Sequence, residues 1–418
     1  MMDSLERRPW LVPLILALLC VIFFRPVLLP QPGFGAVLLL VLHVWWGAWG
    51  MVTLARRFEA SALGGLLAGL TFGFSSLLIA NVWAGHYVRV LVMAWGPWVL
   101  VAYRRALARG TWRAALPGAV ALGLGLMAAV QWLPAVVPIS GVTAASDSGP
   151  TLAGDFAPPG LQFLTLLLPN LLGNPNLADW GYWGGPNYEE WSAFAGVWAL
   201  FAALLAARLK RREVVFYWGL GLLGLVLSIG LLALGQLAPG GGLYLVVIAL
   251  AGLSALVVTH LGLASPAERR ALLRPVLRVW LPLASILVFG VALVLLALWS
   301  LAPPASLHWR WWHAANAAAE TGLMVLAVGL TFWLWREDGP RAVEWASLAT
   351  LAVVLIDLWR IGLPLVTVDA FEPVRPVSLR PRTWLLSAGV SAVGSLGILV
   401  LGSVGFTRSR RTLDEEGM

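Results

Sequence analysis

Long apolar segments constrain the fold of this chain more than any other feature. Several of them approach about 20 residues, the length of a helix that crosses a hydrocarbon core of about 30 Å. Only 11% of the residues are charged, against about 25% in soluble domains. The sequence therefore predicts an all-α polytopic membrane protein with about twelve transmembrane helices. The predicted spans are 10–29, 34–54, 61–81, 87–103, 115–137, 193–207, 214–236, 242–263, 279–301, 314–335, 343–363 and 383–405.

The distribution of basic residues predicts which side of the bilayer each connector occupies. With both termini in the cytoplasm (N-in/C-in), about three quarters of the 28 Lys and Arg residues fall on the cytoplasmic side. Cytoplasmic loops of membrane proteins carry such an excess, and the opposite orientation would reverse it. The formal net charge of +8 thus reflects topology, and we expect no nucleic-acid partner.

The chain is expected to form one transmembrane domain, residues 1–418, in the bacterial cytoplasmic (inner) membrane. Its start, "MMDSLERRPW" followed by an apolar run, lacks a small-x-small cleavage site, so we expect a retained first helix. Residues 406–418 are expected to form a cytoplasmic tail. Cys20 is the only cysteine, so a disulfide within the chain is excluded.

The predicted outer connector 138–192 is much longer than the others. Its middle piece, "LQFLTLLLPNLLG" (161–173), has too few apolar residues before Pro169 to span a bilayer, which indicates a re-entrant or surface-lying segment. The next piece, "NPNLADWGYWGGPNYEEW" (174–191), combines acids with aromatic residues. Loops longer than about 15 residues without regular structure are usually functional or disordered, and the aromatic content argues against disorder.

Glycines in the predicted span 61–81 recur at helical spacing. Gly65, Gly69 and Gly73 would lie on one helix face. Such a face lets another helix approach closely in lipid, where apolar burial gives no net drive for helices to associate. The sequence therefore predicts a packing face here, although glycine is also common in membrane spans generally.

The order of several segments resembles a known family. The similar segments are "LARRFEASALGGLLAGLTFGFSSLLIANVWAGHYVRVLVMAWGPWVLVAYRRAL" (54–107), "AAVQWLPAVVPISGVTAAS" (128–146), "FLTLLLPNLLGNP" (163–175) and "VLIDLWRIGLPL" (354–365). In this order they resemble segments of the bacterial YfhO-like membrane proteins. The resemblance covers residues 50–230, with a weaker match at 350–370.

This resemblance implies a GT-C-like core, the architecture of transferases that take a sugar from a polyprenyl-phosphate carrier at the outer membrane face. YfhO-like members are associated with glycosylation of cell-envelope polymers. Such transferases usually carry an acid in the first outer loop, whereas "RPVLLPQPG" (25–33) has none. The segments 235–244 and 366–383 are also shorter than their counterparts in the family.

His86 and Arg89 lie at the predicted outer turn between the spans 61–81 and 87–103. One interpretation is a plain interfacial turn, with Arg89 reaching the headgroups and Trp83 and Tyr87 in an aromatic belt. The other is a site where Arg89, with His86, binds the phosphate of a lipid carrier, because guanidinium geometry matches phosphate. The resemblance supports the second interpretation, since a Gly-His pair recurs there in the family.

Glu189 and Glu190 are the predicted catalytic residues. A sugar transferase needs a carboxylate to accept the proton of the acceptor hydroxyl and to stabilise developing positive charge. Aromatic residues nearby are candidates to stack on sugar faces: Trp180, Tyr182, Trp183, Tyr188 and Trp191. The alternative is a solvated loop edge with interfacial aromatic side chains. Gln131, at the outer end of the span 115–137, is either a ligand-binding or a helix-packing residue.

Charges inside predicted spans are costly, which points to a functional or a paired role. Asp357 and Arg360 can pair along one helix face, whereas Glu320 has no partner nearby in sequence and favours a transporter. No metal site is predicted, because the two histidines of "HWRWWH" (308–313) lack a third ligand. No cofactor is certain; a divalent cation held by loop acids is one candidate.

Three functions stay open at this point. The first is a GT-C-type glycosyltransferase-like protein whose partners are the lipid bilayer and a polyprenyl-phosphate sugar. The second is a non-catalytic membrane subunit that binds a lipid-linked sugar or stabilises a membrane complex. The third is a secondary transporter that uses Glu320. An acid facing a lipid-phosphate pocket near His86 would favour the first, and its absence would favour the second.

Overall fold

The computed structural model describes residues 2–28, 34–109, 159–175, 182–184, 188–233, 240–301 and 308–366, and within these ranges all regular structure is helical. Seven helical segments are long and apolar enough to cross a membrane. They are Val37–Arg57, Ala62–Trp83, Arg212–Gly230, Gly240–Leu263, Pro266–Leu301, Arg310–Arg336 and Arg341–Leu365. The prediction of an all-helical, multi-pass chain is thus confirmed in this coarse form. The predicted spans 115–137 and 383–405 and the tail 406–418 lie outside the described residues.

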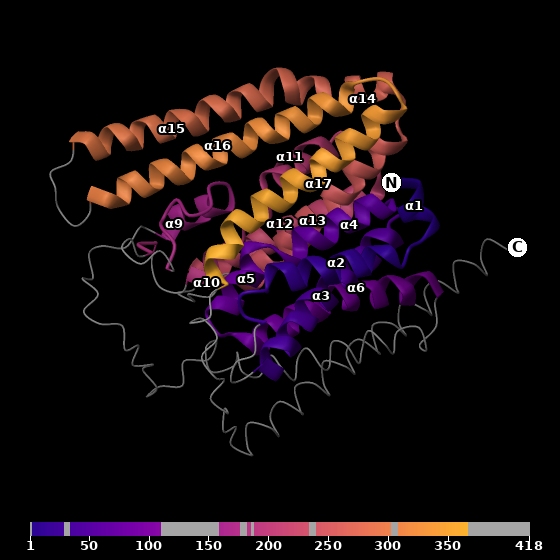
Figure 1. Cartoon of the computed structure of the whole chain (residues 1–418), viewed down its shortest axis with the longest axis horizontal. Coiled ribbons are helices and arrows are strands. Elements are labelled where there is room, and N and C mark those ends of the chain that lie inside the picture. Colours follow the sequence, from indigo (N-terminus) through magenta and orange to yellow (C-terminus); the bar gives the residue numbers. More distant parts are fainter. Residues whose placement is uncertain are drawn as a thin grey trace, which may run out of the picture.

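The helices run roughly side by side (Figure 1). The first half holds α1 (Met2–Arg7), α2 (Leu11–Phe23), α3 (Phe34–Arg57), α4 (Ala62–Gly73), α5 (Ser76–Trp83) and α6 (Tyr87–Arg109). The short elements α9 (Pro159–Gln162), η2 (Phe163–Leu166) and α10 (Tyr188–Trp191) follow. The rest comprises α11 (Val197–Ala206), α12 (Arg212–Ala233), α13 (Gly240–Leu263), α14 (Pro266–Pro275), η3 (Val276–Trp280), α15 (Leu281–Leu301), α16 (His308–Arg336), α17 (Pro340–Gly362) and η4 (Leu363–Leu365).

The packing of α13 and the exposure of α15 show where the core of the described bundle lies. α13 is apolar on all sides and packs against α4, α11 and α12, so it forms the centre of the described bundle. α15 packs mainly against α16 at the edge of the bundle, and its large apolar side chains are exposed (Figure 1). An apolar surface of this kind fits contact with lipid.

The glycine face predicted for the span 61–81 contacts α3. A Cβ added at Gly69 would lie 3.0 Å from the carbonyl oxygen of Ala48, and one at Gly73 would lie 2.9 Å from the Ala48 Cβ. Gly65 faces Val52, which also lies on α3. The three glycines therefore allow α3 and α4 to approach closely, as predicted.

The predicted span 61–81 corresponds to the candidate span Ala62–Trp83, but its helix breaks between α4 and α5. The backbone N–H of Ser76 donates to Phe194 O (3.0 Å), and Phe194 N–H donates to Ser76 Oγ (2.7 Å). Serine side chains offer the backbone such alternatives to helical bonding. The break is fully buried, which makes non-helical backbone tolerable at membrane depth.

The predicted span 193–207 also needs correction, because its helix begins only at Val197. Residues 192–196 have no regular structure and end at Gly196, whose φ of +97° favours glycine. The first backbone N–H of α11 donates to Asp357 Oδ2 (2.6 Å). An acid of α17 thus caps the N-terminus of α11 and stabilises a late helix start.

Arginine-rich connectors meet at one end of the bundle. Arg56 pairs with Glu6 of α1, and Ser61 N–H donates to Thr259 Oγ1 near the end of α13 (2.8 Å). Arg270 of α14 pairs with Asp338 in the α16–α17 connector (2.7 Å). The connector 84–86 and the segment 188–196 contact each other at the opposite end. The cytoplasmic location of the first end stays a prediction.

We predict that Gly69→Ala weakens the bundle because its methyl group would push against the backbone of α3. Overpacking of this kind costs about 1–3 kcal/mol, measured by reversible unfolding in mixed micelles. Gly219→Ala is the matched control, since nothing lies within 4 Å of a Cβ at Gly219. Equal stability of the two variants would contradict close α3–α4 contact.

Candidate functional site

A buried ion pair joins the start of α6 to α10. Arg89 donates through Nη1 to Glu190 Oε1 and through Nη2 to Oε2 (2.6 Å), so the contact is bidentate. The backbone N–H of Gly240, the first residue of α13, also donates to Glu190 Oε2 (3.0 Å). Arg89 is 5% exposed and Glu190 is 7% exposed. Glu190 therefore connects three elements that are far apart in sequence.

Close packing at this pair requires glycine at position 240. A Cβ added there would lie 2.5 Å from Glu190 Oε2 and 2.7 Å from Arg89 Nη2. Sequence reasoning did not single out this residue, although the run of three glycines at 240–242 marks a place where another group can approach the backbone.

Glu189 lies beside His86 at the same end of the bundle. Its Oε1 is 3.7 Å from His86 Nδ1, within ion-pair range when the imidazole is protonated but long for a hydrogen bond. Burial raises the pKa of Glu189 above its ordinary value of 4.5, and the neighbouring carboxylate of Glu190 adds to this, while His86 and Arg89 oppose it. The side chain of His86 is 46% exposed, so Glu189 lies next to an opening toward solvent or headgroups.

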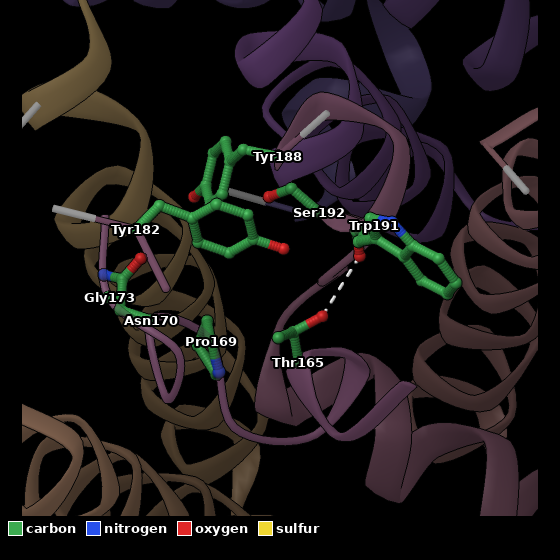
Figure 2. Close-up of a pocket in the computed structure, with 8 residues that line it drawn as sticks. All are labelled: Thr165, Pro169, Asn170, Gly173, Tyr182, Tyr188, Trp191 and Ser192. Carbon is green, nitrogen blue, oxygen red and sulfur yellow. Dashed lines mark hydrogen bonds between the residues drawn. The ribbon is translucent and has the colours of Figure 1, made fainter. Parts of the chain in front are cut away.

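A small hollow lies on the other side of α10 (Figure 2). About 260 Å³ of empty space lies in and in front of it, open space at its mouth included. The lining residues come from η2 and the segment after it and from the 182–192 region. They are Thr165, Pro169, Asn170, Gly173, Tyr182, Tyr188, Trp191 and Ser192. Residues at positions 188, 191 and 192 share one face of a helical turn, so α10 presents the hollow on one face and its acids on the other.

Hydrogen bonds and ring contacts hold the walls of the hollow. Thr165 Oγ1 donates to Trp191 O (3.0 Å; Figure 2), which ties η2 to α10. The rings of Tyr182 and Tyr188 meet edge to face at 5.0 Å. Tyr188 also contacts Trp83 at the end of α5. The predicted interfacial aromatic residues thus form part of a packed wall.

The tyrosine hydroxyls of the hollow are protonated at neutral pH. Burial raises the pKa of Tyr188 to about 12 and raises that of Tyr182 as well. Tyr182 Oη is buried, and among the described residues it has no hydrogen-bond partner. It is therefore a donor and acceptor available to a ligand.

The structure brings most of the predicted site residues together. His86, Arg89, Glu189 and Glu190 form one cluster, and Tyr182, Tyr188 and Trp191 line the adjoining hollow. Trp183 lies beside the hollow and packs with Leu171 and Leu172 against α16. Gln131 and Trp180 lie outside the described residues. The predicted contact of Arg89 with phosphate would require the pair with Glu190 to open, because both Nη atoms bind that carboxylate.

Asn81 is a buried polar residue at this site that sequence reasoning missed. Its Nδ2 donates to Leu77 O (2.8 Å) and lies 3.4 Å from Glu189 O, so it helps hold α10 against α5. An asparagine in an otherwise apolar span is a signal for such a contact, because an amide without partners is costly in lipid.

The intramembrane charges form a separate network at α16 and α17. Asp357 accepts hydrogen bonds from Arg360 Nε (3.0 Å) and Val197 N–H, and it is fully buried. Arg360 Nη1 also lies 3.2 Å from Glu320 Oε2. Glu320 thus has a partner on the neighbouring helix, which sequence spacing did not indicate.

The described residues contain no group of three or more His, Cys, Asp or Glu side chains that could hold a metal ion. No family model matches the chain, and neither a curated protein nor a solved structure is significantly similar to it. The resemblance to YfhO-like proteins therefore stays a prediction, and function has to be argued from the geometry of the site.

We predict that Glu190→Gln destabilises the protein because it removes the carboxylate charge that both Nη atoms of the buried Arg89 contact. Removing one member of a buried pair costs about 3–5 kcal/mol, measured as a fall in thermal or denaturant stability in micelles. The double variant Arg89→Met/Glu190→Met should recover most of this loss, since an apolar replacement removes both charges. A single variant as stable as the wild type would show that the pair is not buried.

Proposed function

We propose that this chain is a GT-C-type, glycosyltransferase-like membrane protein that binds a polyprenyl-phosphate-linked sugar at the outer face during cell-envelope glycosylation. One observation carries this proposal. Two carboxylates, Arg89 and the half-exposed His86 gather on one face of α10, and an aromatic hollow lies on its other face. A transferase of this kind needs a base, a group that binds phosphate and a place for a sugar.

Glu189 is the better candidate for the base. Both oxygens of Glu190 are engaged by Arg89, and one of them also by Gly240 N–H, so a proton acceptor there would have to break these contacts. Glu189 faces a histidine at longer range, beside an opening. Its raised pKa brings it closer to a working pH near neutrality, where general bases are most effective.

His86 is the better candidate for contact with the phosphate. Its imidazole is half-exposed, whereas the guanidinium of Arg89 is buried against Glu190. Arg89 then acts as a positioning residue that fixes α10 and, with it, the neighbouring Glu189. A protonated imidazole would attract both the phosphate and the Glu189 carboxylate.

The residues that line the hollow suit contact with a sugar. The hollow's empty space of about 260 Å³ includes open space at the mouth, so a sugar would lie against the walls at the mouth of the hollow. Aromatic walls from Tyr182 and Tyr188 and the hydroxyl of Tyr182 match the apolar faces and hydroxyl edges of a sugar, whereas the ring of Trp191 points away from the hollow (Figure 2). The lipid chain of such a ligand would remain outside, in the membrane.

A specific observation also favours the non-catalytic alternative. Both carboxylate oxygens of Glu190 are bound, by Arg89 and by Gly240 N–H. Such a contact is expected where a side chain stabilises a fold or a complex. In that alternative the chain binds the lipid-linked sugar or a membrane partner without transferring the sugar. The transporter hypothesis loses its main support, because Glu320 is paired with Arg360.

We predict that Glu189→Gln abolishes transfer without preventing donor binding. The full-length protein in liposomes would receive a radiolabelled polyprenyl-phosphate sugar, and binding and transfer would be measured separately. Loss of a general base should lower transfer by about 10²–10⁴-fold. Glu337→Gln is the matched control, since Glu337 is exposed at the arginine-rich end.

The same experiment should depend on pH in a defined direction. Transfer should rise as the pH passes the raised pKa of Glu189, because only the carboxylate accepts a proton. The free energy of unfolding should change in the opposite direction. The pKa of Glu189 is higher in the folded than in the unfolded state, so its contribution to stability is lost as the pH rises through the folded-state pKa. Glu189→Gln should flatten both profiles. Transfer that survives in this variant would exclude Glu189 as the base, and donor binding without transfer by the wild type would support the non-catalytic alternative.

We predict that Tyr182→Phe weakens sugar binding and leaves the fold intact. Its hydroxyl has no partner among the described residues, so removing it should cost no internal hydrogen bond. Loss of one hydrogen bond to a ligand is worth about 0.5–1.5 kcal/mol, which corresponds to a roughly 2- to 10-fold higher dissociation constant. Unchanged affinity for the donor, measured by scintillation proximity, would show that the sugar does not enter the hollow.

A further inference from the structure

Arg269 is a buried cation at the arginine-rich end of the bundle, and among the described residues it has no partner. It is 4% exposed and lies on the face of α14 that also buries Leu272, Leu273 and, one turn further on, Val276. Within the described part of the chain no acceptor binds its guanidinium, and its Nε is fully buried. A buried charge is stable only when a counter-charge or strong acceptors satisfy it.

Two acids lie near Arg269: Glu268, its neighbour in sequence, and Asp338, which pairs with the adjacent Arg270. Both are already bound to other groups. Glu268 Oε2 accepts from Ser265 N–H and Ser265 Oγ at 2.8 Å each and so completes the N-terminal cap of α14. Asp338 binds Arg270. The other charged residues of α14 and η3 are the exposed Arg274 and Arg278. Within the described part of the chain no acid therefore forms an ion pair with Arg269, and an external anion could supply the missing counter-charge.

The position of Arg269 points to the membrane surface. Side chains of a helix tilt toward its N-terminus, and α14 begins at the end of the bundle where the arginine-rich connectors meet (Figure 1). Its guanidinium is thus directed toward the level of the lipid headgroups. In the other direction α14 continues through η3, where Trp280 is exposed, into α15, where Leu283 and Ile286 are exposed. A phosphate beside Arg269 and an acyl chain along α15 would belong to one lipid molecule.

We propose that Arg269 binds the phosphate of an anionic phospholipid in the leaflet at the arginine-rich end. A guanidinium matches phosphate geometry and binds it through charge-assisted hydrogen bonds. The exposed Arg274 and Arg278 raise the local concentration of anionic headgroups, and the exposed face of η3 and α15 contacts the acyl chains. This site lies at the end of the bundle opposite His86 and Glu189, so it does not depend on the proposed function.

The test compares full-length protein in nanodiscs of phosphatidylcholine with nanodiscs that also contain phosphatidylglycerol. The wild type should unfold at a temperature higher by about 3 °C or more in the anionic discs, because the lipid binds only the folded state. Arg269→Met should lose this difference yet be at least as stable as the wild type in phosphatidylcholine, because it removes the buried charge. Arg57→Met is the matched control, since Arg57 is exposed at the same end; it should keep the difference.

Three outcomes would overturn the proposal. If Arg269→Met keeps the full response to phosphatidylglycerol, Arg269 does not bind the lipid. If Arg57→Met loses the response equally, the effect is one of general surface charge. If inorganic phosphate stabilises the detergent-solubilised wild type as much as the anionic lipid does, and Arg269→Met abolishes this, the site takes free phosphate. Bound phosphatidylglycerol seen by native mass spectrometry in the wild type and lost in Arg269→Met would support the proposal.

Discussion

The bidentate contact between Arg89 and Glu190 is the interaction on which the candidate site depends. In a medium of low dielectric constant neither charge is stable alone, so the pair fixes the start of α6 and the short helix α10 relative to each other. Gly240 extends the constraint to α13, since only a residue without a Cβ lets the backbone N–H reach the carboxylate. Once Glu190 is held, the helical turn sets the directions of Glu189, Tyr188 and Trp191. The hollow and the acid beside His86 are consequences of that one placement.

Polar residues buried in the spans hold the chain that follows α10. Ser76 forms reciprocal hydrogen bonds with Phe194, and Asp357 binds Val197 N–H. Residues 192–196 are therefore fixed at both ends although they form no helix. Non-helical backbone at membrane depth is stable only when protein groups satisfy it, and these two side chains do so. These hydrogen bonds offset the free-energy cost of burying the two polar side chains, and they position α10 and the helix after it.

The sequence allowed the general architecture and the shared location of the site residues to be predicted, but not their pairing. Arginine bias put His86, Arg89 and the 188–191 segment at one end, and the structure brings them together. Hydropathy could not indicate the break before Ser76 or the late start of α11 at Val197. A short apolar run has the same hydropathy whether its backbone is helical or extended. The choice of Glu190 over Glu189 as the partner of Arg89 depends on the orientation of a four-residue helix. The Arg360–Glu320 contact joins two helices, and sequence spacing reports only neighbours along one helix.

The pairing of charges indicates where this molecule would meet a ligand. A chain with so few charged residues keeps a buried one only when something satisfies it. Glu190 and Asp357 are satisfied internally, by Arg89 and by Arg360 with Val197 N–H. Glu189 has a backbone hydrogen bond, but its nearest cation is a histidine 3.7 Å away that is itself half-exposed, and Arg269 lacks a partner in the described chain. These two positions, at opposite ends of the bundle, are the ones that an external group would complete. The physical reason is the same at both, since binding there restores the solvation that burial removed.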